Sequence, residues 1–316
     1  MANLNSLFLE FNNKIKLSSS KKEDLRTGRD ALRKDIKDWF AEKNKIQPKF
    51  YGQGSFSMNT TLNPLSGNEY DLDDGVYLQG YSDDEIDNWP SATAVHSWIK
   101  SATDEQTSKE SSDKNTCVRV NYAADYHIDL PIYIEKDDIY YLAHKADGWT
   151  PSDPKEFTEW FVNNVKDNDE QLRRLVRYLK SWKDYKGISL KSIEITILIA
   201  DNFDFFENRD DKSLNSTISN IIETLEDDFK CIKPSSPYND LFEDTSETKK
   251  SNIISALKTL RKKIELAISE TDEKKASEII RDQFGTRFPL GKETEAKAIY
   301  ETTNTPGVIK HDGRSG

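Results

Sequence analysis

The pattern of hydrophobic and polar positions changes near residue 150. Before that point, short segments alternate apolar and polar residues with a period of two, which is typical of β-strands. Two segments with a helical period accompany them, and the longer one is expected to begin at a capping box, Ser20-Lys21-Lys22-Glu23, and to pack behind a sheet. The strands are predicted at 50–51, 70–78, 117–123 and 127–135, the helices at 20–43 and 86–100, and an exposed loop at 101–115.

Beyond residue 150 the hydrophobic period is mostly helical. The segment 188–200 is ambiguous, because isoleucines at every second position from Ile193 to Ile199 also suit a strand. From Gly291 the chain becomes polar, and a flexible tail is expected there. Helices are predicted at 154–166, 169–185, 213–227, 249–269 and 273–284. Together the patterns predict an α+β fold: a mixed-sheet lobe at 1–150, a helical lobe at 151–290, a tail at 291–316, and a cleft between the two lobes.

Three aspartates stand in the predicted strands. Asp71 and Asp73 alternate with aliphatic residues, so they point to the same face of their strand, roughly 6.5–7 Å apart. Asp129 lies between aliphatic residues in another strand. Three carboxylates on one sheet face repel one another unless cations lie between them, and two divalent ions with oxygen ligands are the usual solution in phosphoryl transfer. Asp74 points to the opposite face and is interpreted as a turn residue or structural partner for Gly75 rather than a ligand.

A candidate phosphate-binding turn precedes the first of these strands. Gly54 and Ser55 lie about sixteen residues before Asp71, and their backbone N–H groups and hydroxyl would suit a triphosphate. Gln53 would line the same turn. The order of a glycine-serine turn, an Asp-x-Asp strand and a third aspartate is typical of nucleotidyltransferases.

Composition narrows the classes of function. The 316 residues carry a net charge of −11, which disfavours broad electrostatic binding to DNA or RNA. No apolar run approaches the ~20 residues of a membrane span, and no secretory signal is expected at the N-terminus. The two cysteines, Cys117 and Cys231, predict neither a disulfide framework nor a zinc site. We therefore expect a cytoplasmic protein without a membrane partner.

Five sequence blocks together resemble one family. They lie in the family's order and span about residues 20–290. They are Gln53-Gly54-Ser55-Phe56, Asp71-Leu72-Asp73-Asp74-Gly75, His127-Ile128-Asp129-Leu130-Pro131, Leu175-Val176-Arg177-Tyr178-Leu179-Lys180-Ser181-Trp182 and Phe284-Gly285-Thr286-Arg287-Phe288-Pro289. The chain resembles the polymerase-β-like nucleotidyltransferases and, within them, the cGAS/DncV-like enzymes (CD-NTases) of bacterial anti-phage systems. The resemblance implies a polymerase-β-like lobe followed by a helical lobe, with 188–200 helical.

The resemblance also implies an activity. It is the Mg²⁺-dependent synthesis of a cyclic di- or trinucleotide second messenger from NTPs such as ATP and GTP, with a separate effector protein reading the product (CBASS). Two Mg²⁺ ions would be held by Asp71, Asp73 and Asp129, with Mn²⁺ as an alternative metal. The donor triphosphate would contact Ser55, with Gln53 and Gly54 lining the turn, and Lys180 would reach the donor phosphates across the cleft. A hydroxyl in the next segment, Ser192 or the less favoured Ser189, would contact the nucleotide.

Without the resemblance, the basic stripe of 169–185 (Arg173, Arg177 and Lys180) would be interpreted as a solvated helix face. Met58 stands where relatives carry a base-stacking aromatic residue, so nucleotide preference is not transferred. The chain shows neither a zinc insertion nor a basic platform, so no nucleic-acid activator is expected.

Alternatives remain open. One is a linear oligonucleotide synthase, another a toxin-type enzyme acting on tRNA or protein, and a third a degenerate nucleotide-binding scaffold. The resemblance further suggests conjugation of Gly316 by a ubiquitin-transfer-like partner, because the tail is polar and ends in glycine.

Overall fold

The computed structural model describes residues 2–65, 67–104, 107, 109–123 and 125–292. Over these residues, eight strands form one mixed sheet in the order β3-β4-β5-β2-β6-β7-β8, with β1 paired to β2. The strands are β1 (Lys49–Gln53), β2 (Tyr70–Tyr77), β3 (Ser112–Asp113), β4 (Val118–Tyr122), β5 (Tyr126–Leu130), β6 (Ile132–Lys136), β7 (Ile139–His144) and β8 (Gly148–Pro151).

The central strand β2 organises the sheet. It runs antiparallel to β1 and parallel to both β5 and β6. The predicted single strand 127–135 is wrong: Pro131 divides it, because proline has no backbone N–H to continue a ladder. The carbonyl of Pro131 still accepts from the Val76 amide at 2.8 Å, so both halves stay on β2. The short strand β3 lies inside the predicted loop 101–115, and the hairpin β7–β8 was not predicted.

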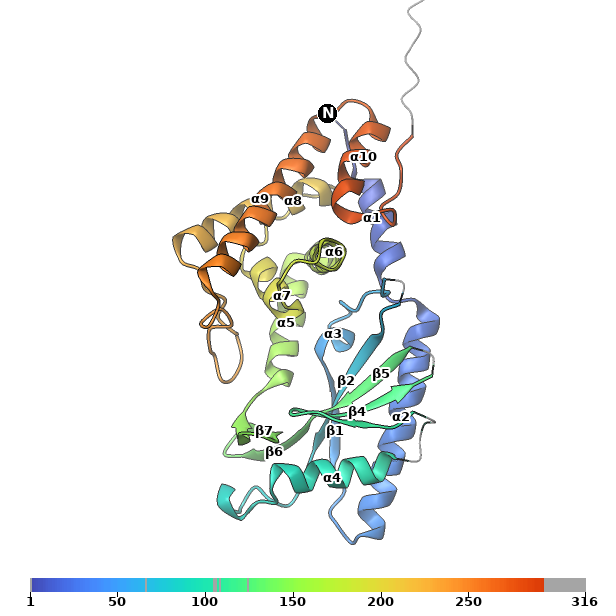
Figure 1. Cartoon of the computed structure of the whole chain (residues 1–316), viewed down its shortest axis with the longest axis vertical. Helices are drawn as coiled ribbons and strands as arrows, with labels where there is room; N and C mark the ends of the chain where they lie inside the picture. The colour runs from blue at the N-terminus through green and yellow to red at the C-terminus, as the bar shows by residue number, and fades with distance from the viewer. Residues whose placement is uncertain (1, 66, 105–106, 108, 124, 293–316) are drawn as a thin grey trace, which may run out of the picture.

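Helices cover the sheet (Figure 1). The long helix α2 (Ser19–Glu42) buries Leu25, Leu32 and Ile36 in the core of the sheet lobe. Its cap is Ser18, whose hydroxyl accepts from the Lys21 amide, so it begins before the predicted capping box. Helix α4 (Ala92–Thr103) begins later than predicted, after a 3₁₀ turn, and the four-residue α3 (Gly54–Ser57) forms the glycine-serine turn.

The remaining helices share a second core. The segment 188–200 contains a helix, so the strand alternative is wrong. The helices of this second core are α5 (Pro154–Asn168), α6 (Glu170–Lys186), α7 (Ser192–Asp201), α8 (Asp210–Asp227), α9 (Glu247–Ser269) and α10 (Glu273–Phe284). All belong to one apolar cluster that is separate from the core of the sheet.

The N-terminal helix α1 (Asn5–Ile15) was not predicted, and it packs in the helical core although it precedes the sheet in the chain. Phe8 and Phe11 lie edge-on to Phe284, with ring centroids 6.1 and 5.3 Å away. Figure 1 shows α1 beside α10, above the sheet. The lobe boundary near residue 150 stays a prediction, with α1 assigned to the helical side by its contacts.

Two further predictions concern the C-terminal tail and membrane-spanning segments. Of the predicted tail, the structure describes only Gly291 and Lys292, so Gly316 lies outside the described residues. Among the helices that are described, none combines the length and apolar character needed to cross a membrane.

Candidate active site

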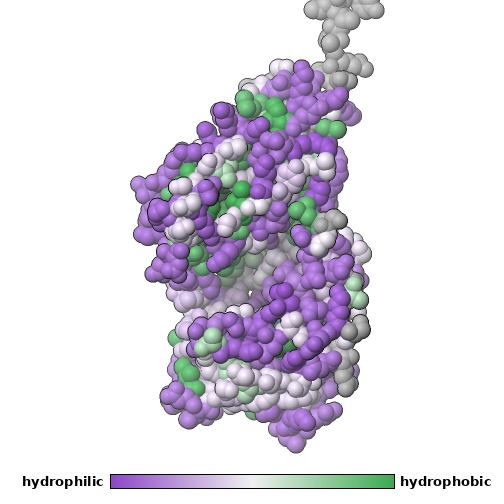
Figure 2. All heavy atoms as spheres, viewed as in Figure 1, coloured by the Kyte–Doolittle hydropathy of each residue, from purple (hydrophilic) through white to green (hydrophobic). Residues whose placement is uncertain are grey.

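A cavity of about 890 Å³ lies where the sheet lobe meets the helical lobe. Its volume is in the range of small-molecule sites, about 300–1,000 Å³. The surface in Figure 2 is hollowed between the two halves of the molecule. Seven residues predicted for the site line this cavity: Gln53, Gly54, Ser55, Asp71, Asp73, Lys180 and Ser192. The structure therefore brings together segments that lie more than one hundred residues apart in the chain.

The glycine-serine turn lies directly against the carboxylate strand. Gly54 has φ +66°, and a Cβ placed there would lie 2.1 Å from Oδ2 of Asp73, so only glycine fits. The Ser55 hydroxyl forms a hydrogen bond with the hydroxyl of Thr61 at 2.8 Å, and the Ser55 carbonyl accepts from the Thr60 amide at 2.8 Å. These contacts close the turn on the segment that follows it.

The three predicted aspartates gather on neighbouring strands. Asp71 and Asp73 lie on β2, and Asp129 on β5 is the register partner of Asp73. Burial raises the pKa of Asp73 well above its usual value, and the charges of Asp71 and Asp129 raise it further. Asp74 points away and is fully buried on Arg33, which donates to both of its oxygens at 2.6 and 2.7 Å. Asp74 is therefore a structural residue, but its partner is Arg33 and it lies within β2 rather than in a turn with Gly75.

Arg119 holds Asp129, and this contact was not predicted from the sequence. Its Nε and Nη2 donate to the two carboxylate oxygens at 2.8 Å each, from the register-paired position on β4. A signal was available, because an aspartate between aliphatic residues needs a cationic partner. Within the described ranges, no three His, Cys, Asp or Glu side chains lie close enough to hold a metal ion. Both carboxylate oxygens of Asp129 are bonded to Arg119, which is consistent with that finding.

The donor set nevertheless suits hard divalent cations, which prefer oxygen ligands. Asp71 and Asp73 face the cavity, and the pKa of Asp73 is raised first by burial and then by the charges of Asp71 and Asp129, whose repulsion a cation would relieve. The buried Oε1 of Gln53, beside this group, has no hydrogen-bond partner. We infer that Asp71 and Asp73 fit such an ion as they stand, and that Asp129 fits once Arg119 releases it.

Lys180 reaches the cavity from α6. Its Nζ donates to the Thr60 carbonyl at 3.0 Å, and burial lowers its pKa to about 8. Ser192 lies in the first turn of α7, on the cavity wall. Contact of either residue with a nucleotide stays a prediction.

Lys233 lines the cavity and was not predicted from the sequence. It lies in the segment between α8 and α9, outside any helix or strand and without a motif. Its Nζ donates to the Ser236 carbonyl at 2.6 Å, and Glu156 holds the same segment by accepting from the Ser236 amide and the Tyr238 hydroxyl. Burial lowers the pKa of Lys233. The positively charged side chain of Lys233 is thus held at the cavity, on a segment that Glu156 of α5 fixes in place.

Comparison with known proteins gives two family matches. The family "Cyclic GMP-AMP synthase DncV-like, nucleotidyltransferase domain" matches residues 48–133. The family "Cyclic GMP-AMP synthase, C-terminal domain" matches residues 169–295. The two matches include the turn, the three aspartates and α6.

Individual relatives agree with these families. A cyclic GMP-AMP synthase of Escherichia albertii is 29% identical over 205 residues, which are 62% of this chain and 45% of that protein. A c-di-GMP synthase of Roseivirga ehrenbergii is 27% identical over 145 residues, 44% of this chain and 38% of that protein. The chain thus spans about half the length, or less, of these relatives.

Solved structures share the fold. The crystal structure of Vibrio cholerae DncV cyclic AMP-GMP synthase has a TM-score of 0.75 at 20% identity, covering 91% of this chain and 97% of that one. The same enzyme in complex with the linear intermediate 5′ pppA(3′,5′)pG has a TM-score of 0.76 at 19% identity, covering 92% and 99%.

Proposed function

The chain belongs to the DncV-like nucleotidyltransferases, and on that premise we propose that it makes a cyclic di- or trinucleotide from NTPs in a Mg²⁺-dependent reaction. Pyrophosphate is the second product. The names of the relatives, cyclic GMP-AMP synthase and c-di-GMP synthase, support the product class. A role in anti-phage signalling, with a separate effector reading the product, is proposed from the family resemblance.

One observation carries the proposal. A single cavity is lined by the Gly54-Ser55 turn, by Asp71 and Asp73, and by Lys180. The turn offers backbone N–H groups, and the ammonium of Lys180 adds a positive charge beside the turn, where it donates to the Thr60 carbonyl, so a triphosphate has both hydrogen-bond donors and a cation. Asp71 and Asp73 belong to the same lining, with Asp73 directly against the turn, and the reacting phosphorus would lie beside them.

In the proposed reaction, the hydroxyl of an acceptor nucleotide attacks the α-phosphorus of the donor. An O–P bond forms, the bond from the α-phosphorus to pyrophosphate breaks, and the hydroxyl proton passes to a base. We assign that base to Asp129, after Arg119 has released its oxygens. Ser55 and Lys180 hold the donor so that attack is in line, and a second, equivalent step closes the ring.

Asp71 and Asp73, joined by Asp129, are the residues that would hold the divalent ions. When bound, such ions supply charge neutralisation at the phosphates. The side chains contribute orientation and, through the cavity walls, partial exclusion of water.

The test is product analysis. Purified protein is incubated with all four NTPs and Mg²⁺, treated with phosphatase, and analysed by mass spectrometry. A cyclic product has no terminal phosphate, so phosphatase leaves its mass unchanged, whereas a linear product loses its 5′ phosphates. The matched control is the double variant Asp71→Asn with Asp73→Asn.

Each alternative has its own outcome. Phosphatase-sensitive products would indicate linear synthesis, and label appearing on added tRNA or protein would indicate a toxin-type transferase. No consumption of NTPs by the wild type, with NTP binding retained, would indicate a scaffold. Any of these results would contradict the proposed function.

A further inference from the structure

Basic side chains of the helical lobe hold the segment that follows the glycine-serine turn. Each donates to a main-chain carbonyl, and three of them lie on one face of α6. The contacts are Arg173 Nε to Met58 O at 2.9 Å, Arg177 Nε and Nη2 to Asn59 O at 3.0 and 2.8 Å, Lys180 Nζ to Thr60 O at 3.0 Å, and Arg287 Nη1 to Asn63 O at 2.8 Å. We call these four side chains the carbonyl clamp.

The clamped segment in turn holds the turn itself. The Met58 amide donates to the Gly54 carbonyl at 3.2 Å, and the Thr60 amide donates to the Ser55 carbonyl at 2.8 Å. The Thr61 hydroxyl pairs with the Ser55 hydroxyl. Because the clamp holds residues 58–60 and these residues hold Gly54 and Ser55, the position of α6 is transmitted to the turn.

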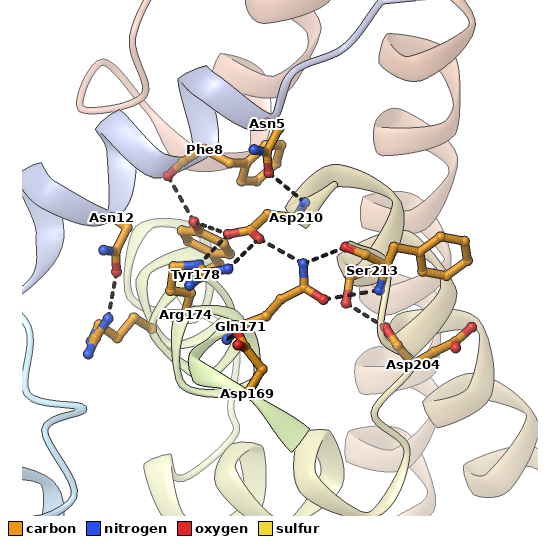
Figure 3. Close-up of polar contacts among 12 residues, drawn as sticks. Asn5, Phe8, Asn12, Asp169, Gln171, Arg174, Tyr178, Asp204, Asp210 and Ser213 are labelled. Atoms are coloured by element: carbon orange, nitrogen blue, oxygen red, sulfur yellow. Dashed lines mark hydrogen bonds and ion pairs between the residues drawn. The ribbon is translucent and has the colours of Figure 1, made fainter. Parts of the chain in front are cut away.

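The other side of α6 is locked by a buried polar network, drawn in Figure 3. Asp210 is fully buried and accepts from Arg174 at 2.7 and 2.8 Å, from Tyr178 at 2.8 Å and from Gln171 at 2.9 Å. The Tyr178 hydroxyl also lies 2.9 Å from the carbonyl of Phe8 on α1. These contacts determine the rotation of α6, and therefore where its basic face lies.

Arg177 is the member of the clamp whose position is hardest to explain by stability. It is only 8% exposed, and its hydrogen-bond partners are two neutral oxygens, the Asn59 carbonyl and Asn12 Oδ1 at 2.6 Å. Burial, followed by the charge of Arg173, lowers its pKa to about 10. A buried guanidinium on neutral acceptors is costly for folding. A positive charge behind the turn, however, favours a bound triphosphate.

We propose that Arg177 is a positioning residue for the donor triphosphate. It acts through Asn59 and Thr60 on the Gly54-Ser55 turn, and it adds positive potential behind that turn. The inference rests on the proposed function, because it assigns the turn to a nucleoside triphosphate. It also implies that the position of α6 against the sheet lobe affects how tightly the donor binds.

The test compares two methionine variants, one at the buried Arg177 and one at the partly exposed Arg209. Arg177→Met removes the clamp contact. Arg209→Met is the matched control, since Arg209 pairs with both oxygens of the buried Asp211 at 2.8 Å, at the start of α8 and away from the cavity lining. A third variant, Arg177→Lys, keeps the charge but loses the fork that contacts Asn59 and Asn12 together.

Four quantities are measured for each protein: Tm, kcat, KM for NTP, and amide hydrogen exchange of residues 58–63. Arg209→Met should lower Tm, since it leaves the buried Asp211 unpaired, whereas Arg177→Met should leave Tm equal or higher, since it removes a buried charge held by neutral acceptors. Only Arg177→Met should raise KM, by about tenfold as expected for one charge-assisted contact, with kcat little changed and faster exchange at 58–63. The KM of Arg177→Lys should lie between the values for the wild type and Arg177→Met. Arg209→Met should keep the wild-type KM and exchange.

The opposite results would overturn the inference. An unchanged KM in Arg177→Met, or an equal rise in Arg209→Met, would reduce Arg177 to a structural residue. If the wild type consumes no NTP, the proposed function fails, and the exchange measurement decides alone: wild-type rates at 58–63 in Arg177→Met would show that the clamp does not hold the turn.

Discussion

The pair formed by Arg119 and Asp129 gives a prediction that needs no substrate. Arg119→Met removes two hydrogen bonds of 2.8 Å from a carboxylate that is 8% exposed and lies beside Asp73. Asp129 is then left charged and unpaired next to like charges. The metal-free protein should therefore lose stability, and the loss should come from the pair rather than from packing.

The magnitude follows from the burial of the two partners. Breaking a fully buried ion pair by removing one partner costs about 3–5 kcal/mol. The Arg119 side chain is 31% exposed, so water screens part of the charge, and we expect a cost of about 2 kcal/mol. For a protein of this size that corresponds to a decrease in Tm of about 3 °C.

The assay is a double-mutant cycle by thermal unfolding in EDTA, with Arg119→Met, Asp129→Asn and the two combined. The double variant has neither charge, so it should be more stable than the sum of the single losses predicts, with a coupling of about 2 kcal/mol. Adding Mg²⁺ should raise the Tm of Arg119→Met more than that of the wild type, because Asp129 is already free. Additive losses, or equal Mg²⁺ effects, would refute the reasoning.

Four further predictions concern catalysis. Asp71→Asn with Asp73→Asn should abolish NTP consumption and leave the metal-free Tm equal or higher, since repulsion is relieved; wild-type turnover would contradict the assigned site. Burial lowers the pKa of Lys180 to about 8, so kcat/KM for NTP should fall as the pH rises through that value and the ammonium is lost. Lys180→Arg should move this fall to higher pH, and identical profiles would exclude Lys180 as its origin. Lys233→Ala should raise the KM for nucleotide about tenfold if its charge contacts substrate, with Tm reporting separately on the loop. Long double-stranded DNA or RNA should leave turnover unchanged, and a salt-sensitive stimulation would show that the acidic net charge misled the prediction.

The sequence alone determined the parts of this protein that depend on local pattern. The alternation around Asp71 and Asp73 places both carboxylates on one face of a strand, because side chains in a strand alternate. The glycine at position 54 was predicted to belong to a phosphate-binding turn, and the structure adds a separate reason for it, since a Cβ there would lie 2.1 Å from Asp73. The order of the five blocks was sufficient to identify the family, whose matches cover residues 48–133 and 169–295.

Local pattern was insufficient where two periods coincide or where a contact spans the chain. The isoleucines of 188–200 suited a strand and a helix equally, and Pro131 divided a segment that looked continuous. The N-terminal helix α1 gave too weak a pattern to be predicted, yet its phenylalanines complete the helical core.

Only the tertiary structure decided which charges meet. Lys180 and Thr60 are 120 residues apart in the chain, and Arg177 and Asn59 are 118 apart. From the sequence alone, the basic stripe that contains Arg177 and Lys180 was equally compatible with a solvent-exposed helix face. The helical period shows which residues lie on one face of a helix but not what that face contacts. Arg119 and Asp129 met because antiparallel register placed them opposite one another. The buried network around Asp210 oriented α6, and packing between α1, α6 and α8 therefore decided that its basic face lies against the glycine-serine turn.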